Sequence, residues 1–176
     1  MKRERILDLV LCALGAALLS ISGVIAIPAG DVGITLQTFT LFLLLLTMGG
    51  KRGSVSCLVY LLLGAVGVPV FSGFRGGFGV LVGPSGGYLF GFLALCLVYW
   101  AFTAGHSDKN CRKLGMIFGL LACYLFGSFW YCAVYAKVET SQLALSMGQI
   151  VLPYIVPDVI KMVCADAVVR RLNKFL

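Results

Sequence analysis

The chain has 176 residues, of which 60% are apolar and 12% are charged, and its mean hydropathy is +1.01. Soluble domains contain about 45–50% apolar and about 25% charged residues, so this composition excludes an ordinary water-soluble protein. Spans of about 20 residues with short connections divide this length into roughly six membrane crossings, without room for a separate catalytic domain. We therefore predict one all-α membrane domain over residues 1–176 that is not an enzyme.

The first apolar run extends from Leu7 to Ile27 behind the basic start Lys2-Arg3-Glu4-Arg5. A secretory signal begins in the same way, but its apolar region has about 7–15 residues and ends at a small-x-small cleavage site, which is not evident here. We interpret the run as a retained membrane helix. Its small residues recur every four positions, as at Ala13 and Ala17, which is typical of a helix face that approaches another helix closely in lipid.

Five further uncharged runs predict the remaining helices of a six-helix bundle. They extend over Leu36 to Met48, Ser54 to Val68, Gly86 to Ala104, Leu114 to Ala136, and Ile150 to Val169. The first two of these runs are short for a bilayer core of about 30 Å, so we expect tilt, buried ends or a neighbouring loop to complete them.

The basic residues of the connections predict the orientation. If there are six crossings, eleven of these basic residues fall on one face of the membrane and two on the other. Because Lys and Arg are abundant in short cytoplasmic loops, we predict a multi-pass protein of the cytoplasmic membrane with both termini cytoplasmic. The net charge of +7 follows from this topology, so we predict no nucleic-acid binding. The eleven are Lys2, Arg3, Arg5, Lys51, Arg52, Lys109, Arg112, Lys113, Arg170, Arg171 and Lys174, and the two are Arg75 and Lys137, with Asp31 and Glu139 nearby.

The cysteines and the single histidine, His106, do not form a motif. The seven cysteines occur singly, mostly within apolar runs, and no C-x-x-C pair is present. We interpret them as packing residues rather than as a disulfide framework or a metal site, and we expect no resident cofactor. They are Cys12, Cys57, Cys96, Cys111, Cys123, Cys132 and Cys164.

Lys161 is a charge inside the last apolar run, three residues after Asp158. An isolated charge at membrane depth costs about 2.5 kcal/mol or more, and a spacing of three places both side chains on one helix face. Either the two form a functional pair that contacts a ligand, or Lys161 snorkels while Asp158 is stabilised by a helix N-terminus. Because Pro153 and Pro157 predict that the helix starts just before Lys161, we favour the functional pair.

The segment from Gly67 to Gly87, between the third and fourth predicted helices, is rich in glycine but retains large apolar residues. Such a composition favours an ordered lid over the outer mouth of the bundle, and the alternative is a structural re-entrant loop without a ligand. The segment lacks the Gly-x-x-x-x-Gly-Lys-Ser/Thr pattern of a phosphate-binding loop, so we do not expect ATP hydrolysis by this chain. Its apolar residues are Phe71, Phe74, Phe78, Val80, Leu81 and Val82.

Three segments of the chain resemble the BioY-type substrate-binding (S) components of energy-coupling factor (ECF) transporters, which take up biotin. The resemblance implies a six-helix S component that binds biotin near its outer face. It also implies partners, namely a transmembrane coupling protein (the T component) and two cytoplasmic ATPases. The segments are Val32 to Thr38, Gly67 to Phe71 together with Gly83 to Tyr88, and Pro157 to Lys161.

Residue by residue, the resemblance implies that Asp158 and Lys161 supply polar contacts of the pocket. It implies that Ala13 and Ala17 form the docking face for the coupling protein. A polar residue of the Gly-rich loop also reaches the ligand in the family, and the corresponding position here is Arg75, where a smaller residue such as Asn or Ser is expected.

The chemistry of biotin agrees with these residues, because the ligand has a ureido group, an apolar thioether ring and a carboxylate. Asp158 is able to accept ureido N–H bonds, and Lys161 to donate to the ureido oxygen or to the carboxylate. Further neutral contacts are expected from Thr35, Gln37 and Tyr88. Two other functions are possible for such a chain. One is a carrier that works alone, either ion-coupled or specific for a related vitamin. The other is an assembly subunit without a ligand.

Overall fold

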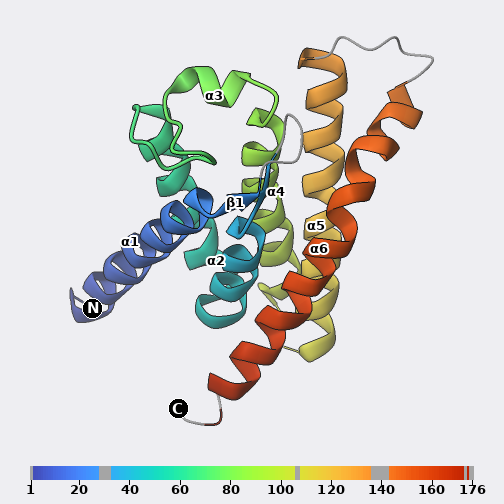
Figure 1. Ribbon diagram of the computed structural model, residues 1–176. Coiled ribbons are helices and arrows are strands. Elements are labelled where there is room, and N and C mark those ends of the chain that lie inside the picture. Colours follow the sequence, from blue (N-terminus) through green and yellow to red (C-terminus); the bar gives the residue numbers. More distant parts are fainter. Residues whose placement is uncertain (1, 28–32, 106–107, 136–142, 173, 175–176) are drawn as a thin grey trace.

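The structure is a computed structural model, and it describes residues 2–27, 33–105, 108–135, 143–172 and 174. Figure 1 shows a bundle in which α1 begins and α6 ends at one end, while the short helix α3 lies at the other end. The elements are α1 (Lys2–Val24), β1 (Ala26–Ile27), β2 (Ile34–Thr35), α2 (Gln37–Ala65), α3 (Phe78–Val82), α4 (Gly86–Thr103), α5 (Lys109–Trp130), the π-helical turn η1 (Tyr131–Tyr135) and α6 (Leu143–Leu172).

Four helical stretches of the described chain are long and apolar enough to cross a membrane. They are Arg3–Val24, Gln37–Ala65, Gly86–Thr103 and Lys109–Val134. The second stretch is folded into two arms, and α6 packs against α2 and α5, so the six-helix bundle predicted from the sequence is confirmed.

Helix α2 reverses direction at Gly49, whose φ of 82° and ψ of 169° are not helical. A Cβ atom on Gly53 would lie 2.7 Å from Cδ2 of Leu45, although residues eight apart in a straight helix are separated by about 12 Å. The side-chain amide of Gln37 also donates a hydrogen bond to the hydroxyl of Tyr60 across the two arms. The arms, residues 37–48 and 50–65, correspond to the second and third predicted helices, but one residue joins them rather than the expected connection of 49–53.

Helices α4 and α5 pack closely because glycine occurs at their contacts. A Cβ atom on Gly91 would lie 2.9 Å from the sulfur of Cys123, and one on Gly119 would lie 2.9 Å from the main-chain oxygen of Leu95. Any larger residue at these two positions would push the helices apart. Leu95 and Cys123 are fully buried in the core that this pair forms with α2.

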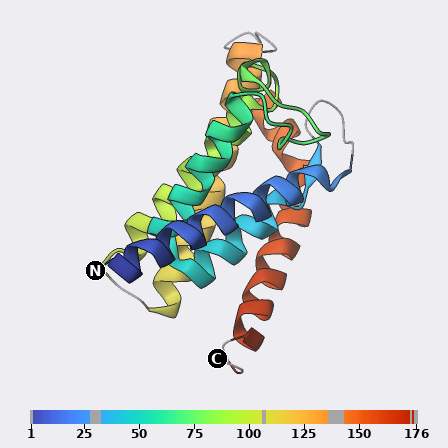
Figure 2. The same ribbon diagram turned by 90° about the vertical axis from the view of Figure 1, so that its left-hand side faces the viewer.

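Helix α1 lies across the bundle and contacts α2 (Figure 2). Its inner face is buried, whereas Ala13 and Ala17 are exposed on the outer face. At the start of α1, Asp8 forms an ion pair of 2.6 Å with Arg52 in the second arm of α2. The beginning of α1 and the turn of α2 therefore lie at the same end of the bundle, as the distribution of basic residues predicted.

The Gly-rich segment is an ordered cover in the structure, and only some of its large apolar residues are buried. Phe71 is buried against Gly64 and Tyr60, and the amide of Gly77 donates a 2.7 Å hydrogen bond to the oxygen of Gly64. Of the large residues, Val70 and Leu81 are also buried, but Phe74, Phe78 and Val82 are exposed. Positions 78 and 82 are one helical turn apart, so their exposed side chains lie on the same side of α3.

The predicted start of the last helix is wrong, because α6 begins at Leu143 and continues through both Pro153 and Pro157. Proline is tolerated inside a membrane helix where neighbouring groups satisfy the freed backbone. The stretch between the two prolines also contacts α5, where the hydroxyl of Tyr124 lies 3.1 Å from the main-chain oxygen of Tyr154. Some predicted positions lie outside the described residues, namely Asp31, Val32, His106, Lys137 and Glu139.

Candidate functional site

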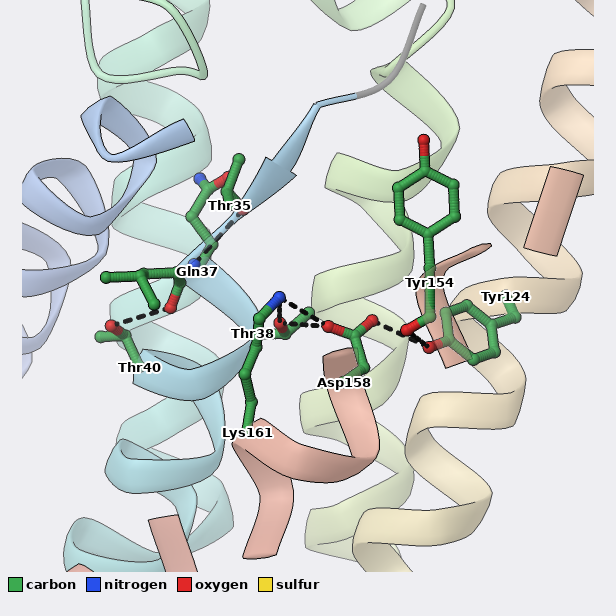
Figure 3. Close-up of polar contacts among 9 residues, drawn as sticks. Thr35, Gln37, Thr38, Thr40, Tyr124, Tyr154, Asp158 and Lys161 are labelled. Carbon is green, nitrogen blue, oxygen red and sulfur yellow. Dashed lines mark hydrogen bonds and ion pairs between the residues drawn. The ribbon is translucent and has the colours of Figure 1, made fainter. Parts of the chain in front are cut away.

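Asp158 is the centre of a buried polar cluster. Only 5% of the residue is exposed, and both of its carboxylate oxygens accept hydrogen bonds. Oδ1 accepts from Oγ1 of Thr38 at 2.8 Å and from Nζ of Lys161 at 2.8 Å, while Oδ2 accepts from the hydroxyl of Tyr124 at 2.8 Å (Figure 3). Lys161 also donates to Oγ1 of Thr38 at 3.1 Å.

Three helices bring this cluster together. Asp158 and Lys161 are three residues apart on α6, Thr38 lies in the first turn of α2, and Tyr124 lies on α5. A buried ion pair is tolerated only when additional hydrogen bonds satisfy both charges, which Thr38 and Tyr124 do here. Breaking the pair would leave one of the charges uncompensated inside the bundle.

The alternative reading of the pair as a snorkelling lysine and a helix-terminal aspartate does not fit the geometry. The side chain of Lys161 is 13% exposed and points to Asp158 and Thr38. Asp158 lies near the middle of α6, far from the helix N-terminus. The pair is therefore held inside the protein by specific contacts.

A cavity opens directly on this cluster. Its empty space is about 400 Å³, part of it open to the surroundings. Its walls combine apolar and aromatic side chains with a few polar groups, as such pockets usually do. The lining residues are Gly33, Ile34, Thr35, Thr38, Tyr88, Phe92, Cys123, Tyr124, Tyr154, Asp158 and Lys161.

A second cavity of about 390 Å³ adjoins the first and lies beneath the Gly-rich segment. The two share the lining residues Gly33, Thr35, Tyr88 and Phe92. The structure thus brings all six residues predicted to bind the ligand to one pair of cavities. Asp158 and Lys161 line the first, Gln37 and Arg75 line the second, and Thr35 and Tyr88 line both.

Tyr88 stands out because its buried hydroxyl has no hydrogen-bond partner among the described residues. A buried polar group without a partner costs about 1–3 kcal/mol, so such groups are rare in stable proteins. The hydroxyl belongs to a residue that lines both cavities. A polar atom of a ligand would satisfy it.

The other three predicted residues already have partners within the chain. Gln37 is 2% exposed and bonds to Tyr60, while Oγ1 of Thr35 accepts a 3.3 Å hydrogen bond from the amide of Gln37. Arg75 is exposed, and its Nε donates to the main-chain oxygen of Ser72 at 3.0 Å. Gln37 and Thr35 therefore shape the wall of the second cavity, and Arg75 stabilises the turn that covers it.

Sequence reasoning missed Thr38 and Tyr124 as members of the site. Thr38 lies in the first turn of α2, three residues after Thr35 of β2, and the available signal was its place in the segment from Val32 to Thr38 that carries the family resemblance. For Tyr124 the only signal was a polar hydroxyl inside an apolar run, which is a common feature of membrane helices. Among the described residues, no group of three or more His, Cys, Asp or Glu side chains is placed to hold a metal ion.

Comparison with known proteins agrees with this arrangement. The family model described as the BioY family matches residues 1–176. A probable biotin transporter BioY from Pyrococcus horikoshii is 39% identical over 93% of this chain and 94% of its own length. The biotin transporter BioY from Thermotoga maritima is 36% identical over 95% of this chain and 96% of its own length.

Solved structures show the same fold. The crystal structure of the S component for biotin from an ECF-type ABC transporter aligns with a TM-score of 0.84 and 27% identity, covering 99% of this chain and 94% of that one. The S component of a bacterial ECF transporter aligns with a TM-score of 0.69 at 15% identity, which is a likeness of fold alone. The match to the family model over the whole length, together with these relatives, shows that the chain belongs to the BioY family.

Proposed function

We propose that this chain binds biotin with high affinity and is the substrate-specific S component of an ECF transporter for biotin uptake. The observation that carries the proposal is the buried cluster around Asp158 at the wall of two adjoining cavities. Relatives that cover nearly the whole chain are named as biotin transporters, and BioY is a transporter family rather than an enzyme family.

The cavities suit the chemistry of biotin. The ligand has a rigid ureido and thioether ring system and a flexible tail that ends in a carboxylate. Asp158 and Lys161 offer a charged acceptor and a charged donor in the first cavity, and the free hydroxyl of Tyr88 lies between the two cavities. Phe92 and Phe71 provide apolar surface for the thioether ring and the tail.

The energy for uptake comes from partner subunits in this proposal. Because the chain lacks a phosphate-binding loop, a T component and two cytoplasmic ATPases supply this energy. The chain itself needs no resident cofactor. Ala13 and Ala17 are exposed on α1, which suits their predicted role as the docking face. The chain crosses the cytoplasmic membrane several times, with α1 beginning and α6 ending on the cytoplasmic side.

The proposal is tested by calorimetric titration of biotin into the purified chain in detergent. Asp158→Asn keeps the size of the side chain but removes the anion, and Lys161→Ala leaves Asp158 without its cation. Each change is expected to weaken binding by about 2–5 kcal/mol, as is typical of removing one partner from a buried hydrogen-bonded charge pair.

Two variants serve as controls. Arg75→Ser is expected to change binding much less, because Arg75 is exposed and bonds only to its own loop among the described residues. Asp8→Asn removes another paired carboxylate, far from the cavities, and binding is expected to stay unchanged. If Arg75→Ser abolishes binding while Asp158→Asn retains it, the ligand is held by the loop and the assignment to α6 is wrong.

A further inference from the structure

The seam between α5 and α6 has cavities whose lining, apart from Tyr124, differs from that of the proposed biotin site. At the end where α5 begins and α6 ends, half of the lining of a cavity of about 820 Å³ is basic, namely Lys109, Arg112, Lys113 and Arg170. A cavity of about 550 Å³ follows it along the seam, and then one of about 1120 Å³ with an almost entirely apolar wall.

These cavities form one continuous groove, because neighbouring cavities share lining residues. The basic cavity and the middle one share Lys113, Met116 and Asp166. The middle cavity and the apolar one share Ile117 and Met162. The groove therefore leads from the basic end of the bundle into the part that the bilayer surrounds.

The basic end of the groove carries an excess of positive charge. Arg170 is paired with Asp166 at 2.6 Å, but Lys109, Arg112 and Lys113 have no acidic partner among the described residues. Asp166 is the only acidic residue in the described lining, and its charge is compensated by Arg170. Three uncompensated cations thus face one cavity, next to the predicted cytoplasmic surface, where anionic lipid headgroups are found.

The apolar part of the groove has the length of an acyl chain. On α5 it extends from Ile117 to Ser128, which corresponds to about 16 Å of helix. On α6 it extends from Met147 to Met162, and Gly148 leaves part of it open because nothing lies within 4 Å of the position of an added Cβ atom. Apart from Tyr124 and Ser128, the lining residues have apolar side chains or, at Gly148, none.

We propose that the α5–α6 seam binds an anionic phospholipid. The phosphate group lies among Lys109, Arg112 and Lys113, and one acyl chain follows the apolar groove toward Gly148. A charged cavity that opens into an apolar groove fits a molecule with a phosphate at one end and a hydrocarbon chain at the other. Basic pockets between membrane helices on the cytoplasmic side are known binding places for such headgroups.

The charge requirement is tested by native mass spectrometry of the full chain with phosphatidylglycerol or with phosphatidylethanolamine that has the same acyl chains. The unaltered chain is expected to retain phosphatidylglycerol preferentially. The triple variant Lys109→Gln, Arg112→Gln, Lys113→Gln is expected to bind it about 100-fold more weakly, since each basic residue near an anionic headgroup contributes about fivefold. The matched control is Arg3→Gln, Arg5→Gln, Lys51→Gln, which removes three charges from the same end of the bundle outside the groove.

The acyl-chain requirement is tested with Gly148→Leu, which fills the open part of the groove without a clash at Cβ. This variant is expected to lose affinity for phosphatidylglycerol, whereas Gly105→Leu, also at an open position but outside the groove, is expected to keep it. Thermal unfolding verifies that each variant is folded. Equal retention of the two lipids would overturn the proposal. Competition by inorganic phosphate at concentrations similar to those of the lipid would overturn it too, because such competition indicates a site for a free anion.

Discussion

At the scale of single residues, the candidate site depends on how the charge of Asp158 is compensated. Its carboxylate accepts from Thr38, Tyr124 and Lys161, which belong to three different helices. Hydrogen bonds to a charged group are worth about 1.5–3 kcal/mol, more than bonds between neutral groups. The cluster therefore stabilises the contact among the helices and at the same time presents a charged pair to the cavity.

Tyr88→Phe and Tyr124→Phe are expected to behave differently, although each removes one hydroxyl. Tyr124→Phe takes a donor from the buried carboxylate of Asp158 and is expected to destabilise the unliganded protein by about 1.5–3 kcal/mol. Tyr88→Phe removes a hydroxyl that has no partner in the described chain, so stability without ligand is expected to stay the same or rise. Biotin binding by Tyr88→Phe is expected to weaken by about 0.5–1.5 kcal/mol.

Thermal unfolding without biotin and calorimetric titration with biotin measure the two effects separately. Equal destabilisation by both variants would contradict the assignment of Tyr88 as an unpaired group. Unchanged biotin affinity of Tyr88→Phe would show that the hydroxyl does not contact the ligand.

At the scale of the elements, the fold-back of α2 positions the site. The first arm carries Thr38 to the cluster, and the second arm carries Gly64, against which Phe71 of the loop is packed. Gln37 and Tyr60 connect the two arms near the cavities. The loop and the charged pair are thus attached to one reversed helix, and the geometry of Gly49 determines how far apart they lie.

Gly49→Ala is expected to destabilise the protein by about 1–3 kcal/mol. The φ of 82° at Gly49 is unfavourable for a residue with a side chain, and because nothing lies within 4 Å of an added Cβ atom, the effect would come from the backbone alone. Gly79→Ala is the matched control, since it has the same free space but lies in α3 without a positive φ. Unfolding midpoints in detergent give the comparison, and equal midpoints for the two variants would contradict the role of Gly49.

At the scale of the whole molecule, the surface divides into regions with different chemistry. The Gly-rich segment covers one end, and most of the described basic residues, Arg75 and Lys161 excepted, lie toward the other end, where α1 begins and α6 ends. The outer face of α1 exposes small residues, whereas the α5–α6 seam is grooved and apolar. The protein partner and the lipid are therefore assigned to different surfaces.

Ala13→Phe or Ala17→Phe is expected to abolish biotin uptake while biotin binding by the purified chain is retained. A large side chain on this exposed face would prevent the close approach of a helix of the coupling protein. Ala101→Phe, at an exposed position on α4, is the control and is expected to keep uptake. Normal uptake by the α1 variants in cells that contain all subunits would exclude this face as the docking surface.

The orientation of the chain is tested by labelling single introduced cysteines with a membrane-impermeant maleimide, after Cys111 and Cys164 have been replaced by serine. Phe78→Cys, at an exposed position of the Gly-rich segment, is expected to react from outside the cell. Asp108→Cys, just before α5, is expected to be protected until the membrane is opened. Reaction of Asp108→Cys in intact cells would overturn the topology with both termini cytoplasmic.

The sequence alone determined the class of the protein, the six helical arms and the charged pair on the last helix. Hydropathy and charge act on each stretch of chain locally, since every membrane helix must satisfy its own backbone and keep its flanking charges out of the lipid. The spacing between Asp158 and Lys161 is local too, and a helix converts it directly into a shared face.

Only the tertiary structure decided what surrounds that pair. Thr38 lies 120 residues before Asp158, and Tyr124 lies 34 residues before it on another helix, so no local pattern relates them. The continuation of α6 through two prolines and the single-residue turn at Gly49 likewise depend on neighbouring helices. Both the joined cavities and the α5–α6 groove arise from packing between helices, which is a property of the folded bundle rather than of any one segment.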